Sequence, residues 1–215
     1  MKNKVLHDIC LKIEEGSFNS IIGQSGSGKS TLLNIIGTLD KSTSGEVYID
    51  GKKTNRMTKK ELAVLRNNNI GFIFQFHYLL PEFTVLENVL IPYKMYSSNK
   101  KNLSTNDAKK RAEELIDLVG LSSVKNKKAN MISGGQQQRT AIARALMNSP
   151  KIILADEPTG NLDSDTTESI YNLLRDINEK LNTTFIIITH DRRIAEKTDR
   201  IIEIKDGRIE TDIKK

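Results

Sequence analysis

The chain has 215 residues, which suits one α/β domain and is enough to bury a sizeable core. It carries 33 basic and 27 acidic side chains, a formal net charge of +6, but only 5% of its residues are aromatic. Because basic and aromatic residues are not interleaved, this charge is typical of a solvated surface, and we expect no nucleic-acid partner.

Three absences bear on the cellular setting. The single cysteine, Cys10, cannot form an intrachain disulfide, which suits the cytosol. Residues 1–5 lack the apolar core of a signal peptide, and no apolar run approaches the roughly 18 residues that cross a membrane. We therefore expect a soluble protein that takes any membrane role from a partner.

Alternating patterns predict antiparallel structure near both ends of the chain. Ile9, Leu11 and Ile13 alternate with polar residues, as in a half-buried strand, and residues 46–50 look similar. Residues 200–210 place Asp206-Gly207 between two apolar runs, which is a hairpin signal.

Four short apolar runs predict buried parallel strands, and each leads directly into a polar residue of interest. Residues 18–22 precede a glycine-rich loop, 70–74 precede Gln75, 152–155 precede Asp156, and 185–189 precede His190. In open α/β sheets the ligand lies at the carboxyl ends of the strands, so one nucleotide site gathers all four groups.

The stretch between Gln75 and Ser133 is helical in character. Residues 84–87 read Thr-Val-Leu-Glu, a capping box, and an apolar stripe over residues 108–119 ends at Gly120. We expect an inserted helical subdomain over about 76–145, with a nucleotide-binding core formed by about 1–75 and 146–215. The lysines between Lys100 and Lys128 are interpreted as a polar helical face.

Residues 23–30 read Gly-Gln-Ser-Gly-Ser-Gly-Lys-Ser, the pattern of a phosphate-binding loop. The glycines let backbone N–H groups approach the phosphates, Lys29 reaches the β- and γ-phosphates, and the Ser30 hydroxyl binds Mg²⁺. An ordinary Gly-Ser turn is the alternative, but strand, loop and amphipathic helix occur in the required order. The predicted ATP contacts here are Gly23, Gln24, Ser25, Gly26, Ser27, Gly28, Lys29, Ser30 and Thr31.

An acidic pair, Asp156-Glu157, ends the third buried run. Such a pair can be a solvated turn, but beside a phosphate loop Asp156 is well placed to bind Mg²⁺. Glu157 is then the natural base for the attacking water. Pro158 fixes the turn that follows.

A second glycine-rich stretch reads Ser-Gly-Gly-Gln-Gln-Gln-Arg over residues 133–139, just before an apolar-periodic helix. It offers another group of backbone N–H donors at a helix N-terminus. One chain needs no second cradle for a single ATP, so we expect it to serve the ATP of a partner copy. This predicts an ATP-dependent homodimer in which Ser133, Gly134, Gly135 and Gln136 act in trans.

Together these motifs resemble the ATP-binding-cassette (ABC) ATPases along the whole chain. The resemblance implies a P-loop α/β core with an antiparallel β subdomain and a helical subdomain. It makes Asp156 the Walker B aspartate and Glu157 the catalytic glutamate, and it has His190 contact the γ-phosphate. It also implies that Gln75 touches Mg²⁺ and the attacking water, and that residues 161–163, ending at Asp163, cross the dimer interface.

The N-terminus departs from the family pattern. The family normally carries a first strand and an adenine-stacking aromatic residue upstream of the segment that matches 5–13, whereas Met1 begins after that point. Either the chain is shortened or mis-started, or another group holds the adenine. We hypothesise a shortened form of a longer ATPase, with weaker ATP affinity and an unpaired edge on the strand over 9–13.

The segment over 76–89 resembles the lipoprotein-releasing (Lol-type) and the macrolide or antimicrobial-peptide exporter ATPases. This resemblance implies an integral membrane permease that docks near Gln75–Phe83, and a peripheral location on the cytoplasmic face of the cell membrane. A cell-division-type ATPase with a non-transporting membrane partner and a soluble non-transport ABC ATPase remain alternatives. A P-loop kinase is a third, against which the second glycine-rich stretch argues.

Overall fold

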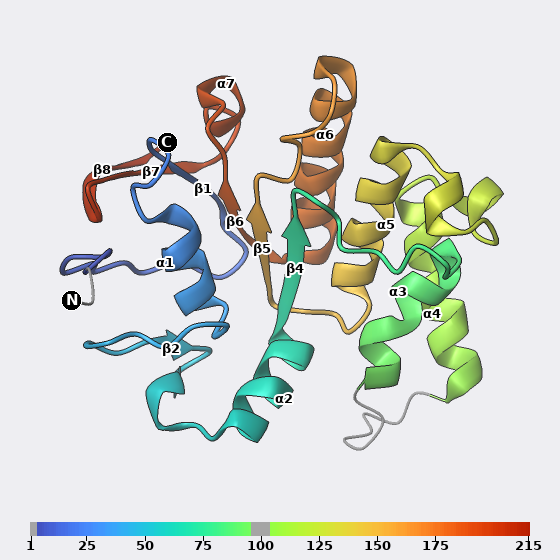
Figure 1. Cartoon of the computed structure of the whole chain (residues 1–215), viewed down its shortest axis with the longest axis horizontal. Coiled ribbons are helices and arrows are strands. Elements are labelled where there is room, and N and C mark those ends of the chain that lie inside the picture. The colour runs from blue at the N-terminus through green and yellow to red at the C-terminus, as the bar shows by residue number, and fades with distance from the viewer. Residues whose placement is uncertain (1–3, 96–103) are drawn as a thin grey trace.

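The computed structural model describes residues 4–95 and 104–215. Residues 1–3 and two lysines of the predicted polar face, Lys100 and Lys101, lie outside these ranges. The chain folds into an α/β structure with a large, mostly parallel sheet and a small antiparallel one (Figure 1). The strands are β1 Phe18–Ile22, β2 Tyr48–Ile49, β3 Lys52–Lys53, β4 Ile70–Phe74, β5 Ile152–Asp156, β6 Thr184–Ile188, β7 Arg200–Lys205 and β8 Arg208–Lys214.

The large sheet has the strand order β4-β5-β6-β1-β7-β8. The first five strands are parallel, and β8 returns antiparallel to β7 through the predicted turn at Asp206 and Gly207. All four predicted buried strands are therefore confirmed, with β5 extended to Asp156 and β6 ending one residue earlier than expected. Their carboxyl ends are in register, since Phe74 pairs with Asp156 and Asp156 with Ile188.

Each face of this sheet has its own apolar core because successive strand residues point to opposite faces. In β5, Ile153 and Ala155 join one core while Leu154 joins the other. The first core packs under the helices that follow β4 in sequence, and the second under α1 and α2. Strands covered on both faces account for the continuous apolar runs in the sequence.

The α-helices are α1 Lys29–Ile36, α2 Lys59–Asn69, α3 Val85–Met95, α4 Thr105–Leu118, α5 Gly134–Leu146, α6 Ser164–Leu181 and α7 Arg192–Ala195, with short 3-10 turns η1 Thr54–Arg56, η2 Ser122–Val124 and η3 Ala129–Met131. Figure 1 shows α3, α4 and α5 grouped beyond β4, away from β7 and β8. The predicted capping box is confirmed, because the Glu87 N–H donates to Thr84 Oγ1 (3.1 Å) and the Thr84 N–H to Glu87 Oε2 (2.8 Å). The helix α4 ends as expected before Gly120, whose φ is 73°.

The predicted strand over residues 9–13 is wrong. Its alternation does report burial, since Ile9, Leu11 and Ile13 are half-buried against the second core while Cys10 is exposed. However, this segment has no strand partner among residues 4–95 and 104–215, and β2 pairs with β3 instead. Alternation predicts which face is buried, whereas a strand also needs a neighbouring backbone. The prediction of an unpaired edge on this strand is wrong for the same reason.

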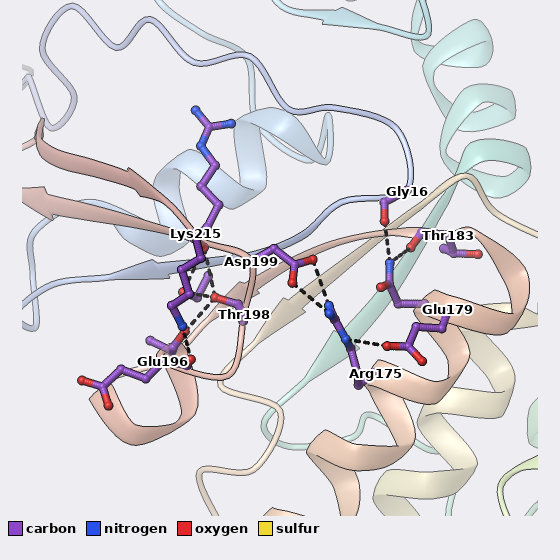
Figure 2. Close-up of polar contacts among 12 residues, drawn as sticks. Gly16, Arg175, Glu179, Thr183, Glu196, Thr198, Asp199 and Lys215 are labelled. Atoms are coloured by element: carbon purple, nitrogen blue, oxygen red, sulfur yellow. Dashed lines mark hydrogen bonds and ion pairs between the residues drawn. The ribbon is translucent and has the colours of Figure 1, made fainter.

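A polar cluster anchors α6 to the loop before β7 (Figure 2). The Arg175 guanidinium donates to both Asp199 carboxylate oxygens at 2.9 and 2.8 Å and to Glu179 Oε1 at 2.9 Å. It also lies over the Phe18 ring, 5.2 Å from the centroid. These contacts hold α6 against β1, and α6 begins close to the site described next.

Candidate nucleotide-binding site

The loop between β1 and α1 is built for close approach of an anion. Gly23 has a φ of 146°, and a Cβ there would lie 2.1 Å from the Ile204 carbonyl oxygen, so only glycine fits. Gly28, with a φ of 102°, precedes α1 and offers no side chain to cap it. The first backbone N–H groups of α1 therefore remain available to a ligand.

A cavity of about 390 Å³ opens over this loop. It collects residues from the loop after β1, from α1, and from the ends of β5 and β6, as expected where parallel strands end together. The lining residues are Val5, Gly23, Ser25, Gly26, Gly28, Lys29, Ser30, Thr31, Asp156, Glu157, Ile188 and His190. Of the other predicted loop contacts, Gln24 supplies a carbonyl to Lys29, and Ser27 is buried with no partner for its hydroxyl among the described residues.

Lys29 lies folded over the loop and is only 9% exposed. Its Nζ donates to the carbonyl oxygens of Gly23 and Gln24, both at 2.8 Å. A lysine ammonium has three donors, so these two contacts leave one for a group in the cavity. The charge is thus held in place beside the loop before any ligand arrives.

Ser30 and Asp156 meet across the floor of the cavity, with Ser30 Oγ 3.4 Å from Asp156 Oδ1. Burial raises the pKa of Asp156, while the Ser30 hydrogen bond and the Lys29 charge act in the opposite direction. The folded chain therefore binds a proton on Asp156 more tightly than the unfolded chain does. It follows that this group's contribution to stability decreases as the pH rises from the unfolded towards the folded pKa.

Glu157 stands on a strained turn directly after β5. Its φ is 48°, in the left-handed region that costs a non-glycine residue about 1–2 kcal/mol. The Glu157 N–H donates to the Ile188 carbonyl at 3.0 Å, which holds the turn against β6. Its Oε2 lies 2.7 Å from His190 Nδ1, so the two groups that follow β5 and β6 are paired. The other carboxylate oxygen of Glu157 has no hydrogen-bond partner within the described part of the chain and remains for another partner.

Gln75 does not line the cavity. It follows β4, and its Nε2 donates to Asn161 Oδ1 at 3.1 Å, while Asn161 Nδ2 lies 3.4 Å from the Gln75 carbonyl. Asp163, two residues further along, caps α6 by accepting from the Thr166 N–H at 2.9 Å. Gln75 is therefore joined to the 161–163 segment rather than to the phosphate loop.

The second glycine-rich stretch also lies outside the cavity. Ser133 caps α5 in a capping box with Gln136, whose Oε1 accepts from the Ser133 N–H at 3.1 Å. A Cβ on Gly134 would meet Leu162, and a Cβ on Gly135 would meet Thr166 at 2.9 Å. This stretch therefore packs beside the start of α6 and contributes nothing to the cavity of its own chain.

Comparison with known proteins decides what this site belongs to. The sequence model of the ABC transporter family matches residues 6–160 of the chain. The chain belongs to the ABC transporter family. Within it, the chain is 48% identical over 209 residues to "Lipoprotein-releasing system ATP-binding protein LolD" of Bacteroides thetaiotaomicron, covering 97% of this chain and 94% of that protein. The protein of the same name from Aquifex aeolicus is also 48% identical, over 96% of this chain and 89% of its own.

Solved structures agree with this family. The ABC cassette MJ0796 in a dimeric post-hydrolysis state bound to ADP and Pi is 49% identical, with a TM-score of 0.88 over 98% of this chain and 90% of that one. The structure of cbiO1 from Clostridium perfringens is 30% identical, with a TM-score of 0.86 over 97% of this chain and 81% of its own. The chain is therefore an ATPase of the ABC type. Within the described residues, no helix combines the length and the apolar character that crossing a membrane requires.

Two lining residues of this ABC ATPase were not predicted. Ile188 ends β6, so the strand-end argument that found His190 also reaches it. Val5 carries no motif. It lies at the cavity because the neighbouring His7 N–H donates to the Gly207 carbonyl at 2.8 Å, which fixes the N-terminal segment against the β7–β8 turn.

Proposed function

We propose that this chain is the ATP-hydrolysing subunit of a membrane transporter that releases lipoproteins, acting as an ATP-dependent homodimer on a separate permease at the cytoplasmic face of the cell membrane. The observation that carries the proposal is the single cavity that unites the phosphate loop with Asp156 and the Glu157–His190 pair. Full-length similarity to lipoprotein-releasing proteins favours this role over the cell-division-type and soluble alternatives.

In this proposal the phosphates of ATP lie over Gly23 to Thr31. The backbone N–H groups at the start of α1 and the remaining Lys29 donor bind the phosphate oxygens. The residues also fit Mg²⁺, because Ser30 and Asp156 present adjacent oxygens, and Mg²⁺ sites are commonly built from one or two carboxylates plus substrate phosphates. Mg²⁺ would neutralise charge on the phosphates, with Gln75 as a further ligand once it leaves Asn161.

Glu157 acts as the base in this proposal. A water lying against its free carboxylate oxygen gives up a proton as it attacks the γ-phosphorus, and ADP leaves from the opposite side. His190 holds the other oxygen of Glu157 at 2.7 Å and so limits the directions in which the carboxylate can point. The backbone bond from Glu157 to Ile188 fixes the turn itself.

The dimer is proposed from two features that lie outside the cavity. Ser133 to Gln136 form the capped N-terminus of α5, outside the cavity of their own chain, and Asp163 caps α6 beside it. Both are assigned to the partner copy's ATP and to the interface. The dimeric state of the MJ0796 cassette supports this arrangement.

We assign the docking site of the permease to the segment that follows Gln75. Its apolar side chains lie outward, with Phe76 66% and Tyr78 64% exposed. Leu80 and Phe83 are exposed as well, so the segment offers an apolar surface beside the catalytic site.

We also propose that residues of about 76–145 form the helical subdomain and that about 1–75 and 146–215 form the nucleotide-binding core. The prediction of no nucleic-acid partner stays a prediction.

Reconstitution tests this function. Proteoliposomes are prepared with the chain, its cognate permease and a membrane-anchored lipoprotein. They are expected to release the lipoprotein when ATP is supplied on the side of the membrane where the chain is bound. Vesicles carrying the Glu157→Gln chain serve as the matched control and are expected to release none. ATP hydrolysis without release of any lipoprotein would overturn the transport role while leaving the ATPase assignment intact.

A further inference from the structure

The docking segment, residues 75–83, combines outward apolar side chains with an unusual backbone. His77 and Tyr78 have φ values of 59° and 48°, two consecutive left-handed residues that are not glycine. Each costs free energy, so neighbouring structure must hold them. The Tyr78 ring packs edge-on against Phe74 at 5.3 Å, but one ring contact does not fix two peptide groups.

Two side chains hold the backbone of the docking segment from beneath. Arg144, on α5, donates from Nη2 to the His77 carbonyl at 2.5 Å and from Nη1 to the Tyr78 carbonyl at 2.6 Å. Asn88, on α3 and fully buried, accepts from the Leu80 N–H at 2.8 Å and donates to the carbonyls of Leu80, Phe83 and Thr84. The segment's polar groups are thus satisfied inward while its apolar side chains lie outward.

The Arg144 contact is the more specific of the two. Burial lowers the pKa of its guanidinium, and among the described residues no carboxylate pairs with it. A half-buried cation without an acid is costly unless its donors are used. Here the planar fork uses two of them on adjacent carbonyls, a geometry that a lysine ammonium does not reproduce.

The helix that carries Arg144 also contacts the catalytic turn. Its N-terminus is Ser133 to Gln136, which we assign to the partner's ATP, and further along Gln138 donates to the carbonyl of Pro158 at 2.5 Å. One rigid element therefore touches the partner-facing end, the turn beside Glu157 and the docking segment.

We propose that Arg144 is a positioning residue that fixes the docking segment to α5, so that ATP engagement at Ser133 and partner engagement at Phe76 and Tyr78 are coupled through this helix. The inference rests on the proposed docking role of residues 75–83. It assigns no contact with ATP to Arg144, which acts through the backbone of His77 and Tyr78.

Hydrogen exchange of the nucleotide-free chain tests the positioning role without any partner. In Arg144→Met, the amides of residues 77–80 are expected to exchange about tenfold faster or more, because the segment loses two hydrogen bonds from a charged group. In Arg144→Lys, the exchange rates of these amides should lie between those of the unchanged chain and those of Arg144→Met. Arg139→Met is the matched control, since Arg139 lies on the same helix but donates to the Val119 carbonyl and Ser169. Unchanged exchange at 77–80 in Arg144→Met, or equal acceleration in Arg139→Met, would overturn the proposal.

A second measurement tests the coupling. The chain contains no tryptophan, so Phe76→Trp provides a single reporter on the docking segment. In a chain that also carries Glu157→Gln, Mg²⁺-ATP is expected to change the fluorescence anisotropy of this reporter. The change should exceed the increase that the larger size of the dimer alone causes. Adding Arg144→Met should remove that local response while size-exclusion chromatography still shows a dimer.

The outcomes separate the two proposals. A local response that persists in Arg144→Met would refute the coupling. Failure of the Glu157→Gln chain to dimerise with ATP would count against the shared-site function, and the exchange experiment would still decide the role of Arg144.

Discussion

Replacing Glu157 by glutamine removes the assigned base with little change of shape. Glutamine still offers an oxygen or an amide within the 2.7 Å contact to His190, and the backbone bond from residue 157 to Ile188 is untouched. We therefore expect the turn to keep its geometry and ATP to bind as before. General base catalysis contributes about 10²- to 10⁴-fold, or about 2.7–5.4 kcal/mol of transition-state stabilisation, so turnover should decrease by that factor.

The assay combines phosphate release with size-exclusion chromatography in Mg²⁺-ATP. The variant should accumulate as an ATP-bound dimer, because binding continues and hydrolysis does not. Glu179→Gln is a suitable control, since Glu179 pairs with Arg175 on the surface of α6, away from the cavity. Near-normal hydrolysis by purified Glu157→Gln, with the control unchanged, would refute the role of this carboxylate as the base.

Three further predictions follow from the site and its supports. Mixing Lys29→Ala with Ser133→Arg chains should restore part of the ATPase activity, because a heterodimer keeps one intact composite site; no recovery in a proven heterodimer would contradict action in trans. Arg175→Ala should lower stability by about 1.5 kcal/mol, roughly 3–6 °C in melting temperature, because it loses a bidentate ion pair and a cation–π contact, whereas the exposed Arg208→Ala should change it little. Asp156→Asn should raise the melting temperature at neutral pH and weaken the loss of stability as the pH rises through the acidic range, because it removes a carboxylate whose pKa is raised by burial. The same substitution should abolish ATPase activity. Thermal melts over the acidic range check the sign of the stability effect.

The sequence predicted the parts of the fold that depend on local pattern. Continuous apolar runs ending in polar residues located β1, β4, β5 and β6, and the Asp206-Gly207 pair located the hairpin. The prediction of a strand over residues 9–13 was wrong. Alternation indicates which face is buried, but it does not indicate whether a neighbouring backbone is free to pair.

The sequence predicted those site residues that directly follow the end of a strand. The phosphate loop, Asp156, Glu157 and His190 meet at one cavity because their strands are parallel and adjacent. The position of Gln75 was not predictable, since its amide bonds Asn161 across the fold, 86 residues along the chain. The Arg144 contact lies beyond sequence reasoning for the same reason: an arginine on a helix gives no sign of which carbonyls it reaches.

The register of the parallel strands bears on which lengths of chain can change during evolution. Phe74, Asp156 and Ile188 form one row across three strands, and Ile21 of β1 joins it beside Ile188. Deleting a single residue from β5 would shift Glu157 by about 3.3 Å along the strand and reverse the faces of the residues before it. Length variation is therefore expected to gather in segments that leave this row untouched, such as the turn between β2 and β3. The strands that carry the site should keep a fixed residue count even where their apolar side chains exchange freely.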